Sequence, residues 1–175
     1  MNAFDPDGRK IAFLKGESPE NVVAFNAIIN KVGRTDGKFA ARLTTLIKSD
    51  HIHIIASPAT AAKSKIKSVR KAAAQAPKNI GAAPQKNESN GEGTSTFTIF
   101  DPTKTESGKT RTGNDFTSSP EATFTHEVLD HAYQKDQGTI DRTIGSSGAP
   151  KHEEDAVGFA DEYRSIVGED LREDY

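Results

Sequence analysis

The fold is decided by residues 119–134, which read SPEATFTHEVLDHAYQ. Ser119 can cap the free amides at the start of a helix, and Pro120 suits the first helical position. Gly138 predicts the end of the helix a few residues beyond this stretch. Apolar side chains recur at helical spacing and would bury one stripe: Phe124, Val128, Leu129, Ala132 and Tyr133. The sequence therefore predicts an amphipathic helix whose other residues need a separate explanation.

Three residues of this helix are typical of a hydrolytic metal site: His126, Glu127 and His131. Zinc binds neutral imidazole nitrogens and carboxylate oxygens, and a catalytic zinc keeps one position for a water whose pKa it lowers to about 7. A glutamate next to the first histidine can take the proton from that water. We therefore predict that the two histidines bind Zn²⁺ and that Glu127 is the catalytic base.

The two histidines stand five residues apart, whereas the common zinc-helix motif separates them by four. At ~100° per residue, an interval of four places the side chains about 40° apart around a helix, and an interval of five places them roughly 140° apart. A regular α-helix would not direct both at one ion. A π-bulge within residues 127–130 restores the angle. We favour this bulge over the alternative in which Asp130, four residues after His126, replaces His131 as ligand.

The third ligand is expected from a second predicted helix, residues 151–167, which read KHEEDAVGFADEYRSIV. Glu153 and Glu154 are both candidates. Glu153 shares a stripe with Val157 and Ala160, whereas Glu154 lines up with small and polar positions. Because the apolar stripe must face the first helix, we select Glu153 and keep Glu154 as the alternative.

Residues 126–131, HEVLDH, resemble the HELLGH signature of dipeptidyl-peptidase III, a zinc family with the same five-residue spacing. They also resemble the HELLGHA motif of toxin domains that end RHS-repeat proteins. Asp130 departs from the glycine that is usual at that position. In related zinc peptidases the ligand glutamate stands three residues before a small residue, as Glu153 stands before Ala156. The resemblance implies a zincin-like zinc metallopeptidase that cleaves a peptide bond.

A short segment near the N-terminus, residues 5–9, reads DPDGR and predicts a turn. It resembles the segment found where an RHS-repeat shell ends and its variable toxin begins. We therefore interpret residues 1–10 as a turn segment that follows an RHS-like core, and residues 11–175 as a single metallopeptidase domain. The resemblance further implies a secreted effector, delivered into a target cell to cleave a protein there. It implies a cognate immunity protein and the RHS-repeat shell as partners.

The composition of the chain limits which partners and which metal ligands are expected. The 175 residues are 34% hydrophobic with a formal net charge of −2, so we expect neither nucleic acid nor membrane as a partner. No apolar run is long enough to cross a bilayer, and the N-terminus lacks the apolar stretch of a signal peptide. The sequence contains no cysteine, so any metal must be bound by His, Asp or Glu.

The remaining segments predict an α+β fold with a small, mostly antiparallel sheet beside the two ligand helices. Residues 19–30 and 38–48 carry helical patterns, and residues 51–56 and 94–100 alternate as strands. By resemblance, residues 94–100 form the sheet edge beside the cleft, where an extended substrate adds as another strand. The pattern alone equally predicts an ordinary core strand. His51 and His53 share one face of the first strand and are alternative ligands, although alternation on a half-exposed strand needs no function.

A basic segment, residues 59–92, separates the two strands and holds seven Lys or Arg against two Glu. Residues 61–76 predict a helix, and the remainder predicts a flexible loop. A solvated insertion is the favoured interpretation, and a basic flap that holds an acidic substrate or membrane surface is the alternative.

Two tyrosines, Tyr163 and Tyr133, are candidates to stabilise the tetrahedral oxyanion of a peptidase. Two other functions compete with peptide cleavage. The site could hydrolyse another substrate, such as nucleic acid, or Asp130 could spoil the metal geometry and leave a catalytically dead binding module.

Overall fold

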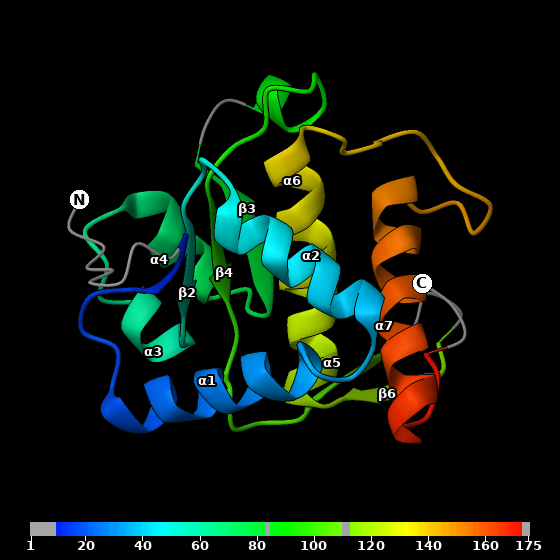
Figure 1. Ribbon diagram of the computed structural model, residues 1–175, viewed down its shortest axis with the longest axis horizontal. Coiled ribbons are helices and arrows are strands. Elements are labelled where there is room, and N and C mark those ends of the chain that lie inside the picture. The colour runs from blue at the N-terminus through cyan, green and yellow to red at the C-terminus, as the bar shows by residue number, and fades with distance from the viewer. Residues whose placement is uncertain (1–9, 83–84, 110–112, 173–175) are drawn as a thin grey trace.

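Short strands alternate with helices along the chain in the computed structural model, which describes residues 10–82, 85–109 and 113–172 (Figure 1). The strands are β1 (Ile11–Phe13), β2 (His53–Ala56), β3 (Lys78–Gly81), β4 (Thr96–Ile99), β5 (Glu106–Lys109) and β6 (Asp115–Ser118). The helices are α1 (Pro19–Val32), α2 (Gly37–Lys48), α3 (Pro58–Ala61), α4 (Lys67–Ala73), α5 (Pro120–Phe124), the π-helix η2 (Thr125–Ala132), α6 (Tyr133–Gln137) and α7 (Lys151–Val167). The turn segment at residues 5–9 lies outside the described residues.

The central sheet has the strand order β1-β2-β4-β3. Its β1–β2 and β2–β4 pairings are parallel, and β3 pairs with β4 antiparallel. The mixed α+β class is confirmed, but the prediction of a mostly antiparallel sheet is wrong for this sheet. The reason lies in the connections, because α1 and α2 form a crossover between β1 and β2, and a crossover of that length brings parallel strands together.

The strand at the edge of the sheet is also not the one expected from sequence. Strand β4, predicted as residues 94–100, lies inside the sheet between β2 and β3. The edge strands are β1 and β3, and β3 belongs to the segment predicted as a flexible loop. Helix α4 of the same segment buries Val69 and Ala72 against the sheet. Residues 59–92 therefore contain part of the core, and the predicted helix at 61–76 is replaced by α3 and α4.

Two apolar clusters cover the two faces of the sheet. The adjacent residues Ile54 and Ile55 of β2 point to opposite faces, as strand geometry requires. Ile54 packs in a cluster with α3 and α4, and Ile55 packs in a larger cluster with α1, α2 and the 120–137 region. That larger cluster includes Phe124, Val128 and Leu129, so the predicted apolar stripe is confirmed.

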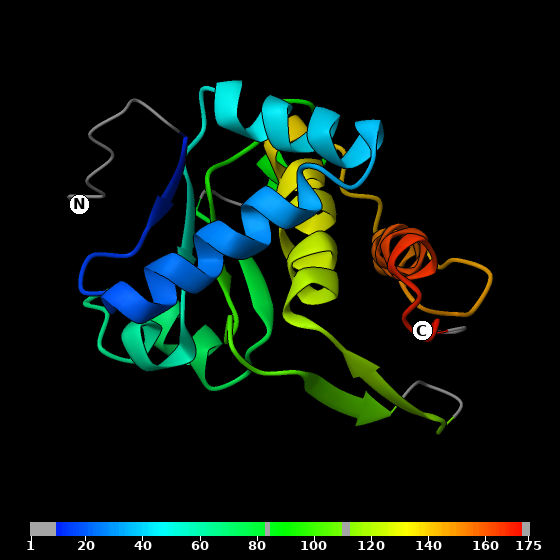
Figure 2. The same ribbon diagram turned by 60° about the horizontal axis from the view of Figure 1, so that its bottom comes forward.

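Helices α5, η2 and α6 follow one another as a single column (Figure 1). Ser119 caps its start by accepting a hydrogen bond from the Ala122 amide, and Gly138 ends it in the left-handed conformation at φ 65°. The column contacts β3 and β4 on one side and α7 on the other. Helix α7 has the predicted bounds. The β5–β6 hairpin projects from the body of the molecule (Figure 2).

No helix in the described part of the chain is long and apolar enough to cross a membrane.

Candidate metal centre

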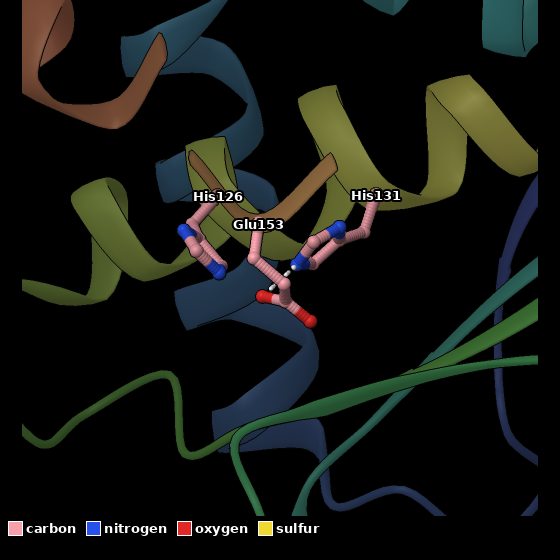
Figure 3. A group of neighbouring side chains, drawn as sticks. All are labelled: His126, His131 and Glu153. Carbon is pink, nitrogen blue, oxygen red and sulfur yellow. Dashed lines mark hydrogen bonds and ion pairs between the residues drawn. The ribbon is translucent and has the colours of Figure 1, made fainter. Parts of the chain in front are cut away.

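Three side chains from two helices converge on one point (Figure 3). His126 and His131 come from η2, and Glu153 comes from the first turn of α7. One ligand atom of each lies within 4.8 Å of the others. The Nε2 atom of His131 is 3.1 Å from Oε2 of Glu153, and the two imidazole rings lie 4.7 Å apart with planes at 88°. These are the three ligands that the sequence predicts.

The backbone makes this convergence possible because residues 125–132 form a π-helix. A wider turn brings residues five apart onto one side, which a regular α-helix does not do. The predicted π-bulge is therefore confirmed, although it extends beyond residues 127–130. The alternative with Asp130 as ligand is wrong, because the Asp130 carboxylate pairs with Arg42 and Gln134 away from the histidines.

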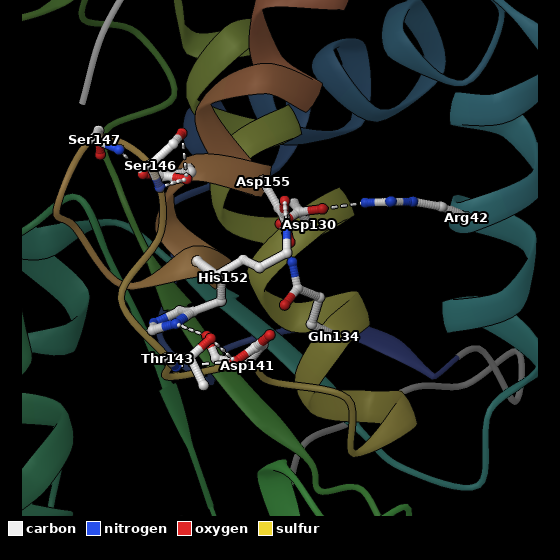
Figure 4. Close-up of polar contacts among 11 residues, drawn as sticks. Arg42, Asp130, Gln134, Asp141, Thr143, Ser146, Ser147, His152 and Asp155 are labelled. Carbon is white, nitrogen blue, oxygen red and sulfur yellow. Dashed lines mark hydrogen bonds and ion pairs between the residues drawn. The ribbon is translucent and has the colours of Figure 1, made fainter.

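The two adjacent glutamates of α7 have separate roles. Glu153 points to the histidines, whereas Glu154 accepts hydrogen bonds from the backbone amides of Ser146 and Ser147 in the preceding loop (Figure 4). The periodicity that selects Glu153 is confirmed by the burial of Val157 on the same helix. Glu154 instead ties the 141–150 loop to the start of α7.

Glu127 stands beside the three converging side chains, in the same cavity. Its side chain is only 7% exposed. Burial raises the pKa of its carboxyl group above the ordinary value, and the nearby His131 acts in the opposite direction. The residue predicted as the base is thus a carboxyl group held inside the site.

The donor set fits Zn²⁺. Two imidazoles and one carboxylate are common ligands of a catalytic zinc, and three protein ligands leave a position open for water. A metal requires neutral imidazole, and burial together with the neighbouring His131 holds the pKa of His126 well below its ordinary value.

A cavity of about 620 Å³ opens at the three residues. The edge strand β3 forms one wall, and Phe116 of β6 contributes an aromatic side chain. Basic side chains also line it: Lys78, Lys135, Arg142 and Arg172. The cavity therefore extends from the three converging residues to the sheet edge. Its four basic side chains are partly balanced by Glu88, Glu127 and Glu153, and Arg142 pairs with Glu88.

His152, which was not predicted as a functional residue, lines the cavity next to Glu153. Its Nδ1 atom lies 2.8 Å from the backbone oxygen of Asp141, which can only accept, so Nδ1 carries a hydrogen. Its Nε2 atom lies 3.5 Å from Oε1 of Glu153. His152 directly precedes the predicted ligand Glu153 in the sequence, and this position could have marked it as a candidate site residue.

Lys135 was also not predicted as a site residue, because no sequence pattern distinguishes it from the other lysines. It is buried, and its Nζ atom donates to the backbone oxygen of Asn79 at 3.0 Å and to the side-chain oxygen of Asn79 at 2.8 Å. Burial lowers the pKa of its ammonium group. Lys135 thereby joins α6 to the edge strand and fixes the cavity wall beside the metal residues.

Neither tyrosine candidate reaches the cavity. Tyr163 is 0% exposed and packs edge-on against Phe39 in the larger core cluster. Its hydroxyl has no hydrogen-bond partner among the described residues, and burial raises its pKa. Tyr133 packs beneath the Arg42 guanidinium, in a separate hollow. The prediction that either stabilises the oxyanion is wrong, because Tyr163 of α7 points into the apolar core and Tyr133 of α6 packs against Arg42.

The two histidines of the first strand lie away from the metal centre. His53 is buried and contacts Thr96 and Asp136, and His51 donates to the backbone oxygen of Glu92. Strand β2 is buried along its length, so the half-exposed strand expected from alternation is wrong.

Comparison with protein-family models, curated proteins and solved structures finds no match for this chain. The resemblance to RHS toxin domains therefore stays a prediction.

Proposed function

We propose that this protein is a zinc-dependent endopeptidase of the zincin type, with His126, His131 and Glu153 as metal ligands. The observation that carries this proposal is the convergence of these three side chains from two separate helices, with Glu127 buried beside them. The two imidazoles and the carboxylate suit Zn²⁺ in type and number. Each of the four residues has one clear chemical role.

When bound, Zn²⁺ supplies Lewis-acid polarisation of a substrate carbonyl and lowers the pKa of an attacking water to about 7. The Glu127 carboxylate would accept a proton from the attacking water as the water oxygen bonds to the carbonyl carbon. Glu127 then donates the proton to the amine nitrogen as the carbon–nitrogen bond breaks. The products are a carboxylic acid and an amine, and Glu127 is regenerated.

An extended peptide suits the cavity because β3 is an edge strand in its wall. The Ala82 amide bonds to the Ser95 oxygen of the neighbouring strand segment, and alternate residues of an antiparallel strand face opposite sides. The backbone groups of Asn79 and Gly81 therefore face away from β4, and on that side the Asn79 oxygen already accepts a hydrogen bond from Lys135. A substrate can add to this edge as a further strand.

His152 takes the role that the sequence analysis gave to a tyrosine. Its Nδ1 hydrogen is donated to the Asp141 oxygen, and a ring that also carries a hydrogen on Nε2 can donate from that atom into the cavity. There it can donate to the oxyanion that forms on the substrate carbonyl. This assignment predicts that His152→Ala lowers kcat more than it raises KM, and an unchanged kcat would contradict it.

The proposal is tested with purified protein, an unstructured protein substrate and stoichiometric zinc analysis. Wild type is expected to hold one zinc per chain and to cleave the substrate. Glu127→Gln should keep the zinc and lose cleavage, whereas Glu154→Gln, on the neighbouring residue that faces the loop, should keep both. Wild-type protein with neither zinc nor cleavage would refute the proposal.

A hydrolase of nucleic acid is the second candidate, favoured by the basic side chains that line the cavity. Phosphodiesters carry the negative charge that such a lining attracts. The same purified protein is incubated with single-stranded and double-stranded DNA and RNA. Degradation of nucleic acid that depends on Glu127, without degradation of protein, would favour this candidate over a peptidase.

We further propose, from the motif resemblance alone, that the protein is an effector toxin released from an RHS-repeat shell and neutralised by an immunity protein. Cytosolic expression of the wild-type chain should stop growth, and Glu127→Gln should not. Equal growth in the two cultures would remove the toxin proposal and leave the enzyme proposal standing.

A further inference from the structure

Arg42 of α2 touches both helices that carry the metal-binding residues. Its Nη1 atom donates to the backbone oxygen of Leu129 at 2.9 Å and to Oδ1 of Asp130, both within η2. Its guanidinium carbon lies 3.8 Å from the centre of the Phe159 ring on α7. One side chain therefore joins the helix of His126 and His131 to the helix of Glu153.

The carboxylate that pairs with Arg42 is enclosed. Asp130 is 1% exposed, and its second oxygen accepts a hydrogen bond from the Gln134 side chain (Figure 4). Tyr133 covers the guanidinium with its ring at 4.7 Å. A charge buried to this degree is costly unless its partners stay in place, so the orientation of Asp130 is strongly constrained.

The orientation of Asp130 is coupled to that of His131 because the two residues are adjacent in η2. A π-helical turn holds one residue more than an α-helical turn. If η2 became a regular α-helix, the residues after that extra residue would rotate by about 100° around the helix axis. Asp130 would then leave Arg42, and His131 would leave His126 in the same movement. The contact with Arg42 favours the one helical register in which the two imidazoles face each other.

We propose that Arg42 and Asp130 are positioning residues for the metal centre, which hold η2 in the π register and α7 against it. This inference rests on the proposed metal site and not on the identity of the substrate. It also explains why aspartate, rather than glycine, suits position 130 in this chain. The side chain is part of the device that aligns the ligands.

The test measures metal binding by the full chain at a temperature where circular dichroism shows the metal-free protein to be folded. Zn²⁺ affinity is obtained by competition with a chelator, and the visible spectrum of bound Co²⁺ reports the coordination geometry. The variants are Arg42→Met, which keeps the apolar stem, and Arg42→Lys, which keeps the charge. Lys31→Gln is the matched control, because Lys31 pairs with Glu121 of the same helical column at an exposed position.

Arg42→Met is expected to weaken Zn²⁺ binding by about 10- to 100-fold and to alter the Co²⁺ bands, as loss of a residue that orients ligands does. Arg42→Lys should fall between this variant and wild type, and Lys31→Gln should bind as wild type. If Arg42→Met does not fold, the double variant Arg42→Met/Asp130→Asn, which removes the buried charge as well, is measured in its place.

Two results would overturn the inference. Folded Arg42 variants with wild-type Zn²⁺ affinity and Co²⁺ spectrum would show that the contact has only a structural role. Wild-type protein that binds neither metal would refute the metal site itself, and the proposed function with it.

Discussion

Two histidine–carboxylate pairs, His131–Glu153 and His53–Asp136, occur in this molecule in different surroundings. The nitrogen–oxygen distances are 3.1 Å and 3.0 Å, so the direct contacts are nearly identical. The His53 pair is enclosed, and its remaining atoms are satisfied by Thr96, Ser49 and Gln137. It joins β2 to α6, and although Asp136 lines a hollow with His51, the His51 ring contacts the Glu92 backbone oxygen and not the pair.

The His131 pair differs in three ways. Its carboxylate is 24% exposed and faces a cavity of about 620 Å³. A second imidazole, that of His126, stands against the first. The Nδ1 atom of His131 is buried without a hydrogen-bond partner among the described residues. A metal site is thus indicated by a further converging donor and an open cavity, and not by the pair itself.

The largest difference between the two pairs is expected in metal binding. His131→Ala should reduce Zn²⁺ affinity by more than about 100-fold, because even residues that only support ligands cost about 10- to 100-fold. His53→Gln should leave zinc stoichiometric and instead lower the free energy of unfolding by about 1–3 kcal/mol. Metal analysis and denaturant unfolding of both variants measure this contrast. Loss of zinc from His53→Gln, with zinc retained by His131→Ala, would contradict this prediction.

A second variant separates metal binding from chemistry within the cavity. Glu127→Gln should retain zinc and lower kcat by about 10²- to 10⁴-fold, the range for removal of a general base. Its amide keeps the shape of the side chain but cannot accept the proton. Steady-state kinetics on a peptide substrate provide the measurement. A variant with wild-type kcat would exclude Glu127 as the base.

A smaller effect, on the stability of the fold, is expected at the His53–Asp136 pair when the pH is lowered. Burial alone would raise the pKa of Asp136, but hydrogen bonds from His53 and Ser49 outweigh it and hold the pKa below its ordinary value. A lowered carboxyl pKa stabilises the fold above the unfolded value of about 3.9, and that stability is lost as the pH falls through the folded pKa. Asp136→Asn should therefore have a free energy of unfolding about 1.5–3 kcal/mol lower than that of wild type near neutral pH.

That difference should shrink as the pH falls below about 3.9, because Asp136 of the unfolded chain is protonated there while the folded chain keeps its charge to lower pH. Denaturant unfolding of wild type and Asp136→Asn over a pH series checks it. A difference that stays constant with pH would show that the charge on Asp136 contributes nothing to stability.

The convergence of His126, His131 and Glu153 could be predicted from sequence because the signals were local. The five-residue interval between His126 and His131 demands a wider helical turn, and η2 provides it. The apolar stripe of α7 selects Glu153 over Glu154, and the structure agrees. Helical periodicity gives the direction of each of these side chains without knowledge of the rest of the fold.

The surroundings of the site could not be predicted, because they depend on contacts between distant segments. Strand β3 has a pattern too short and polar to indicate a strand, and it forms only by pairing with β4. Tyr163 lies on the ligand helix but turns into the core beside Phe39. The partner of Asp130 is 88 residues away, so its role could not be read from the motif.

The most direct test is zinc content measured for wild type, Glu153→Ala and Glu154→Ala purified side by side. These two substitutions change adjacent residues of one helix turn, of which only Glu153 faces the histidines. We predict one zinc per chain in wild type and in Glu154→Ala, and none in Glu153→Ala. Equal zinc content in the two variants, or a wild type that holds no zinc, would contradict the convergence of these side chains on a metal.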